Sequence, residues 1–137
     1  KIMDYDTIIY GGGLYAVGIL GFKKLIKKNY NKLRDKKLVV FSVGMASDNE
    51  ETRKDIINRN FSEEMKEKIK YFHLRGRFDY EELNVMDKIL MQMLKFMLKR
   101  KKEPLTNDEK GVLKSFEHKF DWMSKKNIQP IIDEIKN

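Results

Sequence analysis

The 137-residue sequence contains no cysteine. Disulfides, thiolate metal sites, iron–sulfur clusters and cysteine nucleophiles are therefore excluded. Histidine is almost as scarce, because the only two, His73 and His118, lie far apart and lack the spacing that sets two ligands on one helix or hairpin. We expect both histidines to be structural or surface residues, and nothing in the sequence indicates a metal site.

Long hydrophobic runs are also lacking. The longest, Val85–Leu98, is interrupted by charged and amide side chains, whereas a helix that crosses a bilayer needs about 20 predominantly apolar residues. No signal peptide is recognisable, so we expect a cytoplasmic protein. The first residue is Lys1 rather than methionine, and we expect that the natural start is not included.

Acidic residues are the scarcer charged class, with 21 Asp and Glu against 29 Lys and Arg and a formal net charge of +8. A basic surface attracts nucleic acid, anionic lipid or an acidic partner, so charge alone does not choose among them. Segment Lys23–Lys37 is the most basic, but Tyr30 is the only aromatic residue within it. Bases stack on aromatic side chains, so this composition disfavours a nucleic-acid-binding module.

Three short apolar runs, Thr7–Tyr10, Leu38–Val43 and Tyr71–Leu74, predict buried parallel strands. A helix between the first two would bury Ile19, Leu20, Phe22, Leu25 and Ile26 and end near Asn29. A second helix would begin at Asp48, with Glu51 completing a capping box, and run to about Asn60; a short third helix would follow Ser62. The order predicts a βαβαβ unit with helices on both faces of the sheet.

After the third strand the pattern becomes helical. Val85–Lys101 predicts one long helix with a very wide apolar arc, a polar stripe at Lys88, Gln92, Lys95 and Lys99, and a basic cluster from Lys99 to Lys102. Three roles remain open for the apolar arc: it could pack in the core, bind a second subunit, or place Val85–Lys102 in peripheral contact with the inner membrane face. A polar segment, Asp108–Lys119, precedes a final helix capped by Asn127, whose buried face would carry Ile128, Ile131, Ile132 and Ile135.

Ligands of such sheets bind beyond the carboxyl ends of the strands. The segments predicted to meet there are Gly11–Gly18, Gly44–Ser47 and Arg75–Tyr80. The glycines of the first segment allow positive φ and close backbone approach to a flat ligand, and Tyr15 offers an aromatic face. A tight turn with a core tyrosine is the alternative interpretation.

Segment Gly11–Gly18 follows an apolar strand and consists of glycine, two small turn residues, an aliphatic residue, Tyr-Ala, Val17 and a final glycine. It resembles the loop after the third strand of the flavodoxin family. That loop usually reads Gly-Ser-Pro-Ile-Tyr-Ala-Gly. Phe41–Ala46 is similar to the fourth strand of that family and its loop. The long Met-rich helix and the Phe120–Trp122 lead into the last helix resemble the branch that includes the flavodoxin-type protoporphyrinogen oxidases.

This resemblance implies an α/β fold: one flavodoxin-like domain over residues 1–137, with a doubly wound parallel sheet in three α/β/α layers. The first two strands would be missing, which leaves Thr7–Tyr10 as an edge that seeks a partner, and the long helix would be an insertion after the last strand. The resemblance also implies FMN, whose ring would lie between the Gly11–Gly18 loop and the Gly44–Ser47 loop. In this family a backbone carbonyl of such a loop accepts a hydrogen bond from the reduced flavin. The implied flavin-contacting residues are Gly11, Gly12, Gly13, Leu14, Tyr15, Ala16, Gly18, Val43, Gly44, Met45 and Ala46.

Two departures from the family pattern matter. The Thr/Ser-x-Thr-Gly-x-Thr phosphate loop has no counterpart, so the FMN phosphate lacks its main anchor in these residues, and the chain is basic where electron-carrying flavodoxins are acidic. The resemblance implies electron transfer or flavin-dependent oxidoreduction, with a redox protein or a quinone as partner. An oxidase at the membrane face and a basic module without flavin are the alternatives, and a homodimer stays open. Arg75 and Arg77 could bind an acidic substrate or the flavin, or simply be surface residues.

Overall fold

The computed structural model describes all 137 residues, which form two compact units. The first comprises Lys1–Gly76 together with Met123–Asn137, and the second comprises Arg77–Trp122. All the residues implied to contact flavin belong to the first unit. The single flavodoxin-like domain expected over residues 1–137 stays a prediction.

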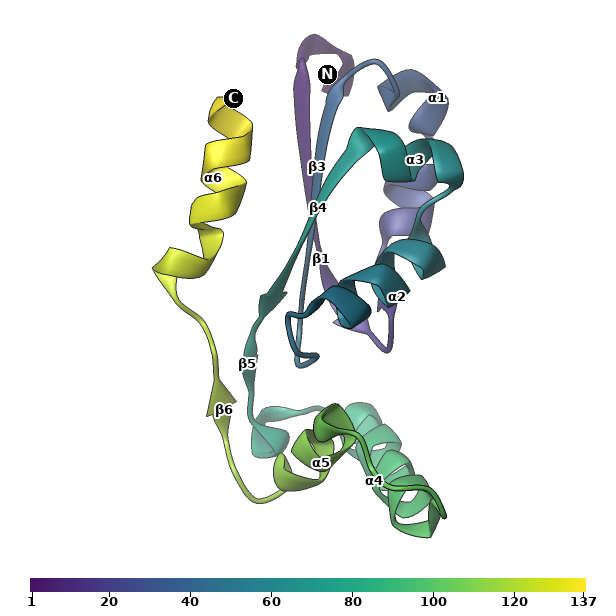
Figure 1. Cartoon of the computed structure of the whole chain (residues 1–137), viewed down its shortest axis with the longest axis vertical. Coiled ribbons are helices and arrows are strands. Elements are labelled where there is room, and N and C mark those ends of the chain that lie inside the picture. The colour runs from purple at the N-terminus through teal and green to yellow at the C-terminus, as the bar shows by residue number, and fades with distance from the viewer. The chain divides into compact units, whose positions relative to one another are not determined.

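The first unit is built on a four-stranded sheet in the order β2-β1-β3-β4 (Figure 1). Parallel pairing joins β1 (Thr7–Tyr15), β3 (Lys37–Gly44) and β4 (Ile69–Arg75). The short β2 (Gly18–Ile19) pairs antiparallel with the last two residues of β1 and makes the sheet mixed. The remainder of the outer edge of β1 has no strand partner.

Helices cover both faces of this sheet, which confirms the predicted three-layer α/β/α fold (Figure 1). One face carries a π-helical turn, η2 (Lys23–Lys27), together with α1 (Tyr30–Leu33), α2 (Glu50–Asn60) and α3 (Glu63–Lys68). The other face carries α6 (Gln129–Lys136), which follows the 3-10 turn η4 (Lys125–Ile128). Another 3-10 turn, η1 (Ile2–Asp4), precedes β1.

The main core lies between the sheet and the helices α1 to α3. Rings of Phe22 and Phe61 pack there with centroids 5.1 Å apart. The buried residues of this core are Ile19, Phe22, Ile26, Tyr30, Leu33, Leu38, Val40, Ile56, Phe61, Met65 and Ile69. On the opposite face the buried residues are Val39 of β3 and Ile131 of α6.

The helix predicted between the first two strands is shorter than expected, because Gly18–Ile19 belong to β2 and the helical turn η2 begins only at Lys23. It ends near Asn29 as predicted, and a second piece, α1, follows. The Asn29 amide donates to the Leu25 carbonyl at 2.9 Å and so ends the first piece. Ile19, Phe22 and Ile26 are buried as predicted, but Leu20, which precedes the helical turn, and Leu25 are exposed.

Two further helix predictions need correction. The N-cap of α2 is Asn49, whose side chain accepts from Thr52 N at 2.8 Å. Asp48 is instead engaged by Arg53, Nη1 to Oδ1, at 2.6 Å. In α6, Ile131 is buried and Ile132 half-buried, whereas Ile128 and Ile135 are exposed, because this helix meets the sheet along a narrow line. Asn127 lies in η4 and does not cap α6.

The second unit combines a two-stranded antiparallel ribbon, β5 (Arg77–Phe78) and β6 (Phe120–Asp121), with helices. These are the 3-10 turn η3 (Tyr80–Glu82), the predicted long helix α4 (Val85–Arg100) and α5 (Asn107–Lys114). The sequence pattern did not predict α5, although Thr106 and Glu109 form a complete capping box at its start. Hydrogen bonds donated by the Lys101 side chain and by the Thr106 backbone N–H lower the pKa of the Glu109 carboxyl.

Candidate functional site

The glycine-rich segment forms the carboxyl end of β1 and not the loop that was predicted. Gly11, Gly12 and Gly13 are extended and pair in parallel with residues 41–43 of β3. A Cβ on Gly11 would lie 2.2 Å from Cζ of Phe41, and one on Gly12 would lie 2.9 Å from the Leu20 carbonyl oxygen. Neighbouring groups of the protein, rather than positive φ, therefore account for the first two glycines.

A tight hairpin follows these glycines. Tyr15 pairs with Gly18, so Ala16 and Val17 form the turn. Ala16 has a φ of 54°, in the left-handed region that non-glycine residues rarely adopt. Such a conformation costs on the order of 1 kcal/mol for an L-residue and is found disproportionately at functional sites.

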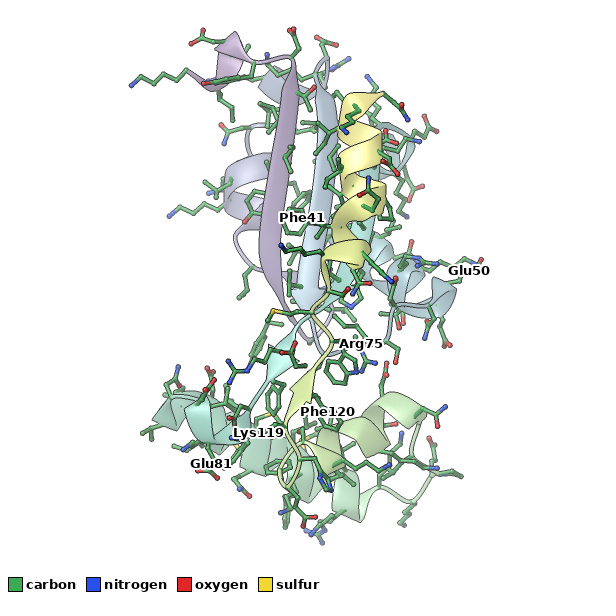
Figure 2. The ribbon with its side chains drawn as sticks, turned by 90° about the vertical axis from the view of Figure 1, so that its left-hand side faces the viewer. Phe41, Glu50, Arg75, Glu81, Lys119 and Phe120 are labelled. Atoms are coloured by element: carbon green, nitrogen blue, oxygen red, sulfur yellow. The ribbon has the colours of Figure 1, made fainter.

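The second predicted segment, Gly44–Ser47, lies next to the hairpin. Gly13 pairs with Val43 in the sheet, and a Cβ on Gly44 would come within 2.8 Å of Leu14 Cβ. The predicted residues of β1 and of the β3 end are thus neighbours at the carboxyl edge of the first unit. Figure 2 shows Arg75, at the end of β4, at this same edge.

The hairpin is held by one residue that the sequence pattern did not single out, Asn60. Its amide oxygen accepts from Ile19 N at 2.9 Å, and its amide nitrogen donates to the Val17 carbonyl at 2.8 Å. The same nitrogen donates to the Ile56 carbonyl of α2 at 2.7 Å. The last residue of α2 therefore joins the hairpin to a helix whose Ile56 is fully buried.

Side chains of β4 hold the second segment in a similar way. The Arg75 guanidinium donates from Nε and Nη2 to the Met45 carbonyl at 3.1 and 2.9 Å. His73 Nε2 lies 2.8 Å from the Ala46 carbonyl, and Gly76 N donates to the Gly44 carbonyl at 3.1 Å. Arg75 thus has a role that the sequence did not reveal, which is to fix a carbonyl of this loop.

The other arginine and the other histidine lie elsewhere. Arg77 belongs to the second unit, where Nη2 contacts the Glu82 carboxylate at 2.9 Å. His118 is exposed in that same unit. Both histidines were expected to be structural or surface residues, and His73 is buried in a hydrogen-bonded position while His118 is exposed.

His73 is part of a buried polar chain. Because a carbonyl oxygen only accepts, Nε2 carries the proton toward Ala46, and in the neutral imidazole Nδ1 is left as an acceptor. Ser42 Oγ, 2.8 Å away, donates to Nδ1, and the Tyr71 hydroxyl donates to Ser42 Oγ at 2.5 Å. Ser42 is 0% and His73 3% exposed, so this series of buried hydrogen bonds fixes the Ala46 carbonyl relative to β4.

The hydrogen-bonded series of Tyr71, Ser42 and His73 predicts a loss of stability at high pH. Burial raises the pKa of the Tyr71 phenol from 10.0 to about 12. A raised pKa means that its stabilising contribution is complete below pH 10 and disappears as the pH rises through about 12. We expect Tyr71→Phe to remove this alkaline loss, which is about 2 kcal/mol once the shift is discounted for the partial exposure of the ring. The measurement is the difference between the free energies of unfolding in urea at high and at neutral pH. The exposed Tyr5→Phe variant is the control, and equal pH profiles in both variants would contradict the assignment.

The surface beside these segments is apolar and open. Tyr15 is 54%, Leu20 58% and Val43 37% exposed. A Cβ on Gly13 would meet only Leu20 Cδ1, at 3.5 Å, so this glycine leaves room on the outward side of the strand. Figure 2 looks onto the face that carries α6, and in this view the helix lies in front of the sheet and leaves β1 uncovered.

The hollow of about 270 Å³ in this unit lies on the other side of β3 from the hairpin. It is lined by Asp48, Arg53, Tyr71–Leu74, Asn127 and Pro130. No segment of the chain has the phosphate-loop pattern. The edge built from β1 and β3 can therefore receive a flat, mainly apolar group through Tyr15, Val43 and backbone, but these residues offer no cradle for a phosphate.

A family model described as a flavodoxin domain matches residues 1–104, which is most of the chain. Searches of the curated proteins and of the solved structures found no significant match.

Proposed function

The chain belongs to the flavodoxin domain family, and from that membership we propose that it is a flavin-dependent redox protein that takes FMN. The observation that carries the proposal is the adjacency of the two segments that the family uses around the flavin ring. In this chain they are the Tyr15–Gly18 hairpin and Gly44–Ser47, which follow paired strands at one edge of the sheet.

The residues fit the ring of a flavin. Tyr15 would offer its aromatic face, Val43 an apolar contact, and Gly13 an uncrowded stretch of backbone. The Leu14 side chain packs against the core, so Leu14 would contribute through its backbone. The complete set that we propose to contact flavin is Gly11, Gly12, Gly13, Leu14, Tyr15, Ala16, Gly18, Val43, Gly44, Met45 and Ala46. Gly11 and Gly12 also make room for the Phe41 ring and the Leu20 carbonyl, because they lack side chains.

A bound flavin supplies one- and two-electron chemistry, while the protein supplies position and electrostatics. Asn60 holds the hairpin, and Arg75 and His73 hold the Met45 and Ala46 carbonyls. These contacts fix which backbone groups face the ring edge. Since the Ala46 and Met45 carbonyls already accept from side chains, we propose the Ala16 peptide, at the strained turn, as the group that is free to hydrogen-bond a flavin nitrogen. A redox protein or a quinone is the electron partner that we propose.

The absence of a phosphate loop in these residues leads to a sharp test. If the ring is what this chain recognises, FMN and riboflavin should bind with affinities within about threefold, because the phosphate adds little without a backbone-amide nest. Binding should quench flavin fluorescence in a titration followed at equilibrium.

ATP, which carries phosphates and an adenine ring, is the matched competitor in that titration. A preference of tenfold or more for FMN over riboflavin would contradict ring recognition and indicate a phosphate site within these residues. Absence of binding to both flavins would overturn the proposed function for this chain.

A second candidate is an oxidase that acts at the membrane face and resembles the flavodoxin-type protoporphyrinogen oxidases. The observation that favours it is the long Met-rich helix α4, most of whose apolar side chains are exposed. Flavin-dependent oxidation of protoporphyrinogen with a quinone acceptor would distinguish this enzyme from a simple electron carrier, which should show no such turnover.

A further inference from the structure

Helix α4 uses only one side for packing inside the second unit. Leu98 is buried and Met91 half-buried. Lys95 Nζ lies 4.7 Å from the centroid of the Phe116 ring, and Lys88 Nζ lies 5.7 Å from that of Tyr80. The predicted polar stripe is therefore corrected, because Lys88 and Lys95 cover aromatic rings while Gln92 and Lys99 remain exposed.

The opposite side of α4 is apolar and exposed. Val85 is 75%, Phe96 61% and Met97 66% exposed. A shallow open groove of about 630 Å³ runs along this side, with Ile89 and Met93 among its lining residues. Soluble proteins seldom expose a contiguous apolar surface of this kind unless something binds it. We call it the α4 apolar face, which consists of Val85, Met86, Ile89, Leu90, Met93, Leu94, Phe96 and Met97.

The charge around this face indicates the kind of partner. Between residues 85 and 102 there are six lysines and arginines and one carboxylate, that of Asp87, which gives a local charge of +5. Lys99 and Lys102 form no ion pair in the structure, and Arg100 lies over the Phe96 ring, 5.1 Å from its centroid. Lys101 contacts the Glu109 carboxylate at 2.8 Å, so Lys99 and Lys102 are the cations of this cluster that are free to meet anions.

A second copy of the chain fits poorly, since it would bring another helix of charge +5 against the first. None of the helices combines the length and the apolarity that crossing a bilayer demands. An exposed apolar face bordered by lysine and arginine is the pattern of a helix that lies in the plane of a membrane interface. Long cationic side chains there can rest on apolar neighbours while their heads reach lipid phosphates, as Arg100 rests on Phe96.

We propose that the α4 apolar face and the basic cluster Lys99–Lys102 bind an anionic phospholipid surface. The apolar side chains would enter the acyl boundary, and the cations would pair with head-group phosphates. The proposal rests on α4 and its charge alone, so it is independent of whether the first unit binds flavin.

Flotation of the full chain with vesicles tests it. Vesicles of phosphatidylcholine with about 30% phosphatidylglycerol should carry the protein upward, and about 0.5 M salt should release most of it. Met93→Glu with Met97→Glu should abolish flotation. Lys99→Gln with Lys102→Gln should weaken it about 30-fold, since each cation near the surface contributes roughly one factor of five.

Leu20→Glu with Leu25→Glu is the matched control, because these exposed apolar side chains lie in the first unit and should leave flotation unchanged. Circular dichroism melting confirms that each variant folds, and only folded variants are compared. No flotation at low salt would overturn the proposal, as would equal flotation with phosphatidylcholine alone. So would a dimer in sedimentation that the Met93→Glu, Met97→Glu variant loses, since a second copy would then cover the face.

Discussion

Replacing Phe22 by alanine should lower the free energy of unfolding of the first unit by about 3–5 kcal/mol. Phe22 is 1% exposed, and its ring packs against Phe61 at 5.1 Å and against Tyr10 at 6.1 Å between centroids. The side chain therefore joins η2, β1 and the end of α2, so its removal leaves a cavity that no single neighbour can fill. Because domains of this size are stable by only about 5–15 kcal/mol, the variant should be close to unfolded at ordinary temperature.

Urea denaturation followed by far-ultraviolet circular dichroism measures this loss. Tryptophan fluorescence is unsuitable because Trp122 lies in the second unit. The control is Leu25→Ala, three residues along the same segment, whose side chain is 53% exposed and should cost less than about 1 kcal/mol. A loss below about 1 kcal/mol for Phe22→Ala would show that the core between β1 and α2 is not packed as described.

Replacing Tyr15 by alanine should weaken flavin binding by about 10- to 100-fold, if the proposed site is correct. Stacking of a base-like ring on an aromatic side chain is worth about 1–3 kcal/mol, and Tyr15 is the aromatic residue of the hairpin. Its side chain is 54% exposed, so its removal should cost little stability. Fluorescence titration with riboflavin and FMN measures the affinity.

Two variants make the result specific. Tyr15→Phe keeps the ring and should bind flavin as the unchanged protein does. Tyr5→Ala removes an equally exposed tyrosine, 63% accessible, that precedes β1, and should also have no effect. Equal affinities for Tyr15→Ala and the unchanged chain would remove Tyr15 from the site and leave the flavin to be sought at another surface.

Much of the fold follows from local pattern. The three parallel strands, the short helix after Ser62 and the helix from Val85 agree with the structure to within a few residues, except that β1 extends to Tyr15. Apolar runs and capping residues act between neighbours in the chain, so they are legible without tertiary information. The family membership was also legible, because the Leu14-Tyr15-Ala16 element and the order of strands are properties of the sequence.

The contacts that shape the candidate site join residues that lie far apart in the chain. Gly11 and Gly12 suggested a loop with positive φ, but their neighbours are the Phe41 ring and the Leu20 carbonyl, and the group that fills the space beside a glycine cannot be inferred from the glycine. Asn60 and Arg75 hold the hairpin and the Met45 carbonyl over separations of 43 and 30 residues. The Leu14-Tyr15-Ala16 element and the strand order thus determined the family, whereas the long-range hydrogen bonds that fix the candidate site became visible only when β1, β3 and β4 were paired.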